Sequence, residues 1–552
     1  VDAIASGVGR CVNADAAETG LPDESADVVV GEAMLSMQGE KAKRAIMGEA
    51  ARILRPGGRY VIHEASPELF GDAEQQSLAE YSDAAIVTFA RSGSESSDVP
   101  RAYDESYLED MDIKGYAGDF HSDRLDSDAD LGRHYLELTA TEEALLAYVS
   151  ERFNKVIVLV NSGNAMELAF LDEAAYGVDA CLWIGNPGQD GLYAVGDILS
   201  GAVSPSGRTV DTYAYDSLSA PALQNFGKNV MSGSDNAPFV VYQEGIYVGY
   251  KYYETRYEDC VLGQGNAEAA VGAPEGAGSW SYSDAVQFPF GFGLSYTRFK
   301  RELLDVTHEG EGLLAKVRVT NEGQVAGRDV AELYATAPVR QGVEKSAAVL
   351  VAFAKTDELA PGEAAELELR CCERDLASWD VSAGCWVLDA GSYAISLRSD
   401  SHTVIDQREL SLGEKRFQTD SATGNPVKNR FDDVTDYMDA YVTQLSRADF
   451  AGTFPAPAQD KTAASVGLAL KEYDVAEHVD PSDEMPLTRE KNGVSLSDLR
   501  GRPMDDPLWE KLLDQLGTNV MTIILNNHTH GTDSVDSVGK PRTFEGDGPA
   551  GI

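Results

Sequence analysis

Short apolar runs alternate with stretches of helical spacing in the first part of the chain. The run "ADVVVGEA" is typical of a buried strand, and "RYVIHE" predicts a second strand. Between them, "EKAKRAIMGEAARIL" places Ile46, Ala50 and Leu54 on one helical stripe. The "RPGG" that follows ends this helix, because proline cannot continue it and glycine permits positive φ. The order strand, helix, turn, strand predicts an α/β piece over residues 1–66.

The same alternation continues, with different loops, over residues 67–299. "AAIVTFARSGSESSDVPR" predicts a strand that enters a polar loop, and "KVIVLVNSGNAMEL" predicts a strand, a turn and the start of a helix. "GVDACLWIGNPGQDGLYAVGDILSG" predicts a strand, a Pro-Gly loop and a helix. Strands that alternate with helices indicate a mostly parallel sheet. Loops at the carboxyl ends of such strands are where ligands bind in open α/β sheets.

A strand-rich region follows Phe299. "LLAKVRVTNEGQVAGRDVAELYA", "AAELELRC" and "GSYAISLRS" alternate apolar and polar residues, which predicts an all-β, immunoglobulin-like sandwich over residues 300–412. Residues 413–500 are mostly polar and predict a linker with helices, among them "VTDYMDAYVTQLSRADF". Over residues 501–552 we expect a partial α/β piece, with a helix in "DDPLWEKLLDQL" and then a strand in "VMTIIL".

Composition narrows the classes of function. The chain has 552 residues, enough for several domains, and a net charge of -46, which disfavours binding to nucleic acid or to anionic membranes. No apolar run reaches the ~18 residues of a membrane helix. The six cysteines form no CxxC pair, so we expect reduced thiols and a cytoplasmic location. No signal peptide is visible, although the chain begins with Val1 rather than Met.

Four long segments in the middle of the chain carry a resemblance to a known family. They are "VIVLVNSGNAMEL", "NPGQDGLYAVGDILSGAVSPSGRTVDTY", "YQEGIYVGYKYYETRY" and "FPFGFGLSYTRF". In this order they resemble the α/β-sandwich domain of glycoside hydrolase family 3, the β-glucosidase family. The resemblance implies that residues 67–299 form this domain without its first βα unit and that residues 300–412 form a fibronectin type III-like domain. It also implies that residues 501–552 open the family's (β/α)8 barrel, in swapped order.

The front piece resembles a second family. Asp15, "LPDESADVVV" and "RPGG" resemble the later half of a class I S-adenosylmethionine-dependent methyltransferase. Its glycine-rich loop, which would cradle the cofactor with backbone N–H groups, has no counterpart here. We therefore expect no cofactor and read residues 1–66 as a partial domain. A methyltransferase fusion remains an alternative function.

The hydrolase resemblance assigns site residues. A retaining glycosidase needs two carboxyl groups ~5 Å apart, one as nucleophile and one as general acid/base. The family's G-E-x-x-D-R segment corresponds to "GSESSDVPR", which makes Glu95 the acid/base and lets Asp98 orient the loop; Ser96 replaces the usual Gly. Asp547 in "DGPAG" corresponds to a residue that binds sugar hydroxyls. The nucleophile's "SDW" motif does not occur, and "ASWDVS" lies in the predicted β-sandwich.

These assignments predict a small carbohydrate substrate and a β-glucosidase-like retaining hydrolase, of which the chain is expected to be a fragment that is inactive alone. A non-catalytic carbohydrate-binding protein is the other alternative, and a homo-oligomer is compatible with the sequence. His528 and His530 are two ligands without a third, so no metal site is expected. The aromatic residues of "YVGYKYYETRY" could stack on sugars, but we interpret them as core.

Overall fold

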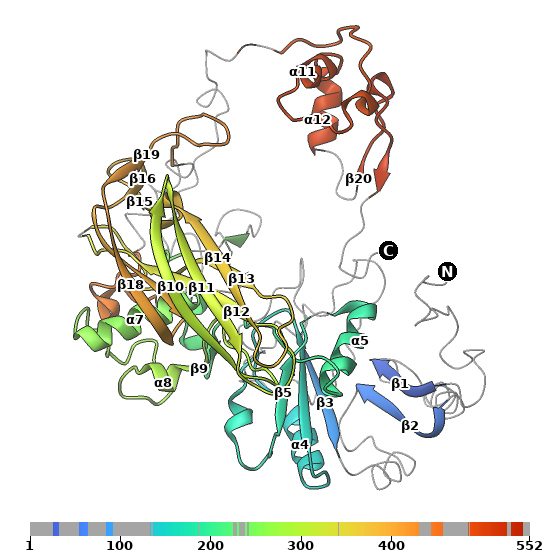
Figure 1. Ribbon diagram of the computed structural model, residues 1–552, viewed down its shortest axis with the longest axis vertical. Helices are drawn as coiled ribbons and strands as arrows, with labels where there is room; N and C mark the ends of the chain where they lie inside the picture. Colours follow the sequence, from blue (N-terminus) through green and yellow to red (C-terminus); the bar gives the residue numbers. More distant parts are fainter. Residues whose placement is uncertain are drawn as a thin grey trace. The chain divides into compact units, whose positions relative to one another are not determined.

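The computed structural model describes two compact units. One comprises residues 1–186 and 193–469, and the other comprises residues 187–192 and 470–552 (Figure 1). The residues that the structure describes are 26–32, 54–63, 84–91, 133, 136–185, 187–224, 229–230, 238–239, 242–340, 342–429, 443–455, 484, 486–526 and 531–544.

A three-stranded parallel sheet forms the centre of the α/β domain. Its strands β3 (Ala85–Arg91), β4 (Val156–Ser162) and β5 (Ala180–Trp183) lie in the order β3-β4-β5. Apolar side chains of β3 and β4 pack with those of α4 (Ala140–Ser150) in one buried cluster. All three strands were predicted from the sequence. The helix α5 (Gly188–Leu199) confirms the helix that was predicted after the Pro-Gly loop.

The front piece contains a parallel strand pair, β1 (Ala26–Glu32) and β2 (Leu54–His63). Both strands were predicted, but the expected helix is wrong at its last residue, because Leu54 pairs with Ala26 as part of β2. The pairing register shifts between Ala26 and Val28, whose partners are Leu54 and Arg59. The "RPGG" residues lie within β2, at this shift in register, and the rest of the expected helix lies outside the described residues.

The helix α7 (Tyr250–Leu262) contributes to a second buried cluster of the α/β domain. Tyr247, Tyr252 and Tyr253 are buried in one cluster with Trp280, which confirms the interpretation of this aromatic stretch as core. Short elements complete the domain: η3 (Ala169–Asp172), β6 (Tyr213–Ala214), η4 (Ser217–Ser219), α6 (Pro221–Gln224), β7 (Asn229–Val230), β8 (Pro238–Phe239), α8 (Tyr282–Ala285) and β9 (Val286–Phe288).

An antiparallel β-sandwich follows, as the alternating pattern predicted. Val317 and Val319 of β11 are buried in its core, whereas Lys316 and Arg318 between them are exposed. The sheets have the orders β10-β11-β14, β13-β12-β17-β18 and β15-β16-β19. Their elements are β10 (Phe299–Glu309), β11 (Gly312–Asn321), β12 (Val330–Thr336), β13 (Val349–Lys355), β14 (Ala364–Cys372), η5 (Glu373–Leu376), β15 (Ser378–Asp380), β16 (Cys385–Leu388), β17 (Gly391–Arg398), β18 (Val404–Leu412) and β19 (Lys415–Phe417).

A buried ion network joins the α/β domain to the β-sandwich. Asp329, which is fully buried, accepts a hydrogen bond of 2.5 Å from Arg208 of the α/β domain and bonds of 2.6 and 2.7 Å from Arg301 of β10. Nearby, Glu332 accepts from the Tyr334 hydroxyl at 2.7 Å, and burial raises the pKa of Glu332 to about 7. One carboxylate thus connects the two domains through Arg208, which lies 121 residues before it in the sequence.

The second unit has its own small apolar core, which contains Leu499, Leu512 and Val538. The strand predicted for "VMTIIL" is wrong: these residues belong to the helix α12 (Thr518–Asn526). Val520, Met521 and Ile524 pack against the core at helical spacing, whereas Leu525 is exposed. The other elements described after the sandwich are α10 (Phe450–Thr453) in the first unit and η7 (Leu496–Leu499), α11 (Leu508–Leu513), β20 (Gly531–Thr532), η8 (Asp536–Val538) and β21 (Thr543–Phe544) in the second.

Candidate active-site edge of the α/β domain

The carboxyl ends of the three parallel strands form one edge of the sheet. Arg91 ends β3 and pairs in register with Ser162, the last residue of β4, while β5 ends at Trp183 beside them. Glu95 and Asp98 follow Arg91 by four and seven residues in the sequence. Both lie outside the described residues, as does Asp547. The structure therefore describes the edge of the sheet where the candidate loop, which contains Glu95 and Asp98, begins and ends.

Arg91 holds the start of this loop. Its guanidinium donates two bonds of 2.7 Å to the carboxylate of Glu142 and one of 2.5 Å to the main-chain carbonyl of Glu137. The Arg91 side chain is only 1% exposed, so this bidentate pair is shielded from water and salt. Since Glu137 and Glu142 come after residues 92–132, the clamp joins the end of β3 to the point where the chain returns to the sheet.

Glu142 also takes part in the N-terminal cap of α4, the helix that follows residues 92–132 in the sequence. Thr139 and Glu142 form a capping box, in which each side chain accepts a hydrogen bond from the other residue's backbone N–H. Arg133 donates to both oxygens of Glu143, at 2.7 and 2.9 Å, and to the carbonyl of Leu138 at 2.7 Å. Four charged side chains thus fix the first turn of α4 at the edge of the sheet.

The loop after β4 is fixed to its neighbours by short polar contacts. The Ser162 hydroxyl donates to the carbonyl of Asn164 at 2.8 Å and accepts from its N–H at 3.0 Å, which closes the predicted Ser-Gly-Asn turn. The indole N–H of Trp183 donates to the Ser162 carbonyl at 2.7 Å and ties β5 to this turn. These contacts join the turn after β4 to the end of β5.

Glu167 is a buried carboxylate, and a candidate site residue, that the sequence analysis did not single out. It is buried, and its carboxylate accepts from the N–H of Ser217 at 2.6 Å while its own N–H donates to the carbonyl of Leu136. Burial raises the pKa of Glu167 to about 7, although the bond from Ser217 lowers it. The sequence feature that could have identified it is a carboxylate between two apolar residues, Met166 and Leu168, after a predicted strand and turn. A buried carboxyl that titrates near neutrality is typical of functional sites.

Glu167→Gln is expected to change how stability depends on pH. In the wild-type chain, the raised pKa means that the native state holds a proton that the unfolded state releases between pH 4.5 and about 7. The contribution of this group to stability is therefore greatest below pH 4.5 and is lost as the pH rises to about 7, a change of about 3 kcal/mol. Between pH 5 and pH 8, the free energy of unfolding measured with urea should fall less for the variant than for the wild type. The exposed Glu151→Gln is the control, and parallel pH curves for Glu167→Gln and wild type would contradict the assignment.

In the described part of the chain, no three His, Cys, Asp or Glu side chains gather closely enough to hold a metal ion. Nor does any helix among those residues have the length and apolar character needed to cross a membrane.

Two protein-family models match parts of this chain. The model of the glycosyl hydrolase family 3 C-terminal domain matches residues 18–250, and the fibronectin type III-like domain model matches residues 329–401. The chain carries a glycosyl hydrolase family 3 C-terminal domain. Because the first match begins at residue 18, it favours this family over a methyltransferase for most of residues 1–66. The second match lies within the β-sandwich, here called the fibronectin type III-like domain.

Several relatives of this family 3 chain are named β-glucosidases. The chain is 31% identical over 387 residues to a β-glucosidase of Ruminococcus albus, covering 67% of the chain and 36% of the relative. It is 28% identical over 515 residues to β-glucosidase A of Butyrivibrio fibrisolvens, covering 86% of the chain and 55% of the relative. A solved β-glucosidase structure from Paenibacillus barengoltzii shares the fold, with a TM-score of 0.56, 24% identity, and coverage of 88% of the chain and 47% of the solved one. The chain thus spans about a third to a half of these proteins.

Proposed function

We propose that the protein containing this chain is a retaining glycoside hydrolase that acts on β-linked glucosides or related small oligosaccharides. The observation that carries the proposal is the family match over residues 18–250, which covers the sheet edge where Arg91 precedes Glu95. Relatives named β-glucosidases support the substrate class. No observation favours the methyltransferase or the non-catalytic binding protein as a second function.

In this proposal Glu95 works as general acid and then as general base. It first protonates the oxygen of the leaving group, while a nucleophilic carboxylate attacks the anomeric carbon and forms a glycosyl-enzyme ester. It next removes a proton from the water that cleaves this ester. The Arg91 clamp supplies a fixed starting point for the loop, which such positioning requires. Asp98 orients the loop, and Asp547 accepts hydrogen bonds from sugar hydroxyls.

The test is hydrolysis of 4-nitrophenyl β-glucoside by the protein that includes this chain. We expect release of β-glucose before it mutarotates, which proton NMR detects as retention of configuration. The 552-residue polypeptide alone is expected to give no such turnover, because its sequence has no match to the nucleophile motif and no ester can form without that group. Binding of glucose without hydrolysis by the longer protein, or release of α-glucose, would overturn the proposal.

A further inference from the structure

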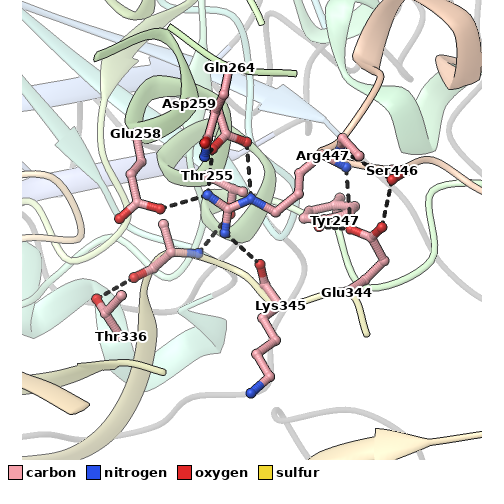
Figure 2. Close-up of polar contacts among 12 residues, drawn as sticks. Tyr247, Thr255, Glu258, Asp259, Gln264, Thr336, Glu344, Lys345, Ser446 and Arg447 are labelled. Carbon is pink, nitrogen blue, oxygen red and sulfur yellow. Dashed lines mark hydrogen bonds and ion pairs between the residues drawn. The ribbon is translucent and has the colours of Figure 1, made fainter. Parts of the chain in front are cut away.

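Residues 443–455, here called the clasp, follow the fibronectin type III-like domain in sequence but pack on the α/β domain. Figure 2 shows the centre of this contact, where Arg447 lies between α7 and the loop that carries Glu344 and Lys345. The clasp also adds Leu445 and Phe450 to the buried cluster around Tyr252. The hydrophobic core of the α/β domain is therefore completed by residues that come after the sandwich.

Arg447 makes the polar centre of the contact. Its guanidinium donates to Asp259 at 2.5 and 3.1 Å, to Glu258 at 2.7 Å and to the main-chain carbonyl of Lys345 at 3.1 Å (Figure 2). Asp259 is fully buried and also accepts from Gln264 at 2.6 Å. If Arg447 withdrew, Asp259 would remain as a buried carboxylate without its cation, which is strongly unfavourable.

A second carboxylate fixes the backbone of the clasp beside Arg447. Glu344 accepts from the Ser446 hydroxyl at 2.6 Å and from the N–H of Arg447 at 3.3 Å, and it also accepts from the Tyr247 hydroxyl (Figure 2). Glu344 belongs to a loop of the fibronectin type III-like domain, whereas Tyr247 precedes α7. The clasp thus bonds to both domains at the place where they meet.

The apolar side of the clasp covers a buried arginine. Phe450 lies against Tyr247 and Tyr252, and its ring centre is 5.4 Å from the guanidinium carbon of Arg256. Arg256 is fully buried; it donates to the carbonyls of Ala267, Ala269 and Val271, and also to the Tyr252 hydroxyl. Without Phe450, water would reach this charge on one side. The clasp therefore closes the aromatic surroundings of Arg256.

The surface under the clasp is shaped to receive it. A Cβ on Gly265 would lie 1.9 Å from the carbonyl oxygen of Arg447, so only glycine permits the approach. The carbonyl of Gly265 also accepts from the N–H of Phe450 at 3.0 Å. Asn266 donates to the Asp449 carboxylate at 2.6 Å and accepts from the N–H of Ala451 at 2.7 Å. Close backbone approach and paired hydrogen bonds are features of a specific docking site.

We propose that the clasp is an internal docking segment, which attaches the C-terminal part of the chain to the α/β domain independently of the covalent path through the fibronectin type III-like domain. The clasp belongs to the first unit, which extends to residue 469, and the main part of the second unit follows in the sequence from residue 470. The site on α7 recognises an arginine followed by an aromatic residue three positions later. This role does not depend on the proposed hydrolase activity.

The test cuts the chain between the sandwich and the clasp. A site for a sequence-specific protease is inserted into the exposed turn at residues 421–424, and the cleaved protein is run on a size-exclusion column at about 1 µM. We expect the two fragments to elute together. Gly265→Ala should weaken their association by about 100-fold or more, since its Cβ collides with the clasp, and Arg447→Met should do the same by leaving Asp259 unpaired.

Gly263→Ala is the matched control for the first variant. Gly263 has the same left-handed backbone, with φ of +65° against +62° for Gly265, but a Cβ there would meet nothing within 4 Å. Its fragments should stay associated, as in the parent. Separation of the fragments without any substitution would overturn the proposal, and so would affinities of Gly265→Ala and Arg447→Met within about 3-fold of the control. If Gly265→Ala fails to fold, the Arg447→Met result decides.

Discussion

Glu95→Gln, made in the protein that contains the whole site, is expected to lower kcat by about 10²–10⁴ for aryl β-glucosides with poor leaving groups. Glutamine cannot donate the proton that a basic leaving oxygen needs, so the first step should become slow and strongly dependent on the pKa of the released phenol. Activated substrates, such as 2,4-dinitrophenyl β-glucoside, need no such proton, and their glycosylation rate should change little. Steady-state kinetics over a series of phenols measures this dependence.

A matched control for this variant lies close to Glu95 in the sequence. Glu105 follows Glu95 by ten residues in the same acidic stretch, and Glu105→Gln is expected to leave kcat close to that of wild type. If Glu95→Gln instead lowered the rate equally for every leaving group, Glu95 would not be the proton donor. An equal loss in both variants would point to an effect of loop charge rather than to acid catalysis.

Asp329→Ala is expected to produce the largest loss of stability, about 3–5 kcal/mol, because it leaves Arg208 and Arg301 at the domain junction without their buried carboxylate. The side chains of both arginines are only 10–11% exposed, so water replaces the lost bonds poorly. Urea unfolding, followed by fluorescence and circular dichroism, gives the change in free energy. The signals of the two domains should separate as the junction weakens.

An exposed ion pair serves as the control for Asp329. Asp406 pairs with Arg408 at 2.6 Å on the surface of the same domain, with side chains 39% and 43% exposed. Asp406→Ala should change the free energy of unfolding by about 0.5 kcal/mol or less, because surface pairs contribute little. A similar small loss for Asp329→Ala would mean that the junction network does not hold the domains together.

Much of the fold was predictable because it follows local patterns. The β-branched runs that became β3 and β4 fill a buried parallel sheet, and the alternation in β11 matches its two faces. The failure at Val520–Leu525 has a physical reason: a short apolar run fits a buried strand and a half-buried helix equally well. Only the packing of Val520 and Ile524 on one side distinguishes them.

The candidate site was predictable to a smaller degree. The position of Glu95 came from the family resemblance, and the structure describes only the clamp that precedes it. Contacts between distant residues, such as Arg91 with Glu142 or Arg447 with Asp259, leave no periodic signal in one sequence. Glu167 looked like one of 91 acidic residues until burial raised its pKa. These features depend on tertiary packing, which local patterns do not encode.

The most direct measurement is azide rescue of Glu95→Ala in the protein that contains the complete site, with 2,4-dinitrophenyl β-glucoside as substrate. With this leaving group the glycosyl-enzyme ester still forms, but no base activates water to cleave it. Azide needs no base, so it should attack the anomeric carbon, release the enzyme carboxylate, accelerate turnover and yield β-glucosyl azide. No acceleration by azide, or formation of α-glucosyl azide, would contradict the role of Glu95 as the acid/base.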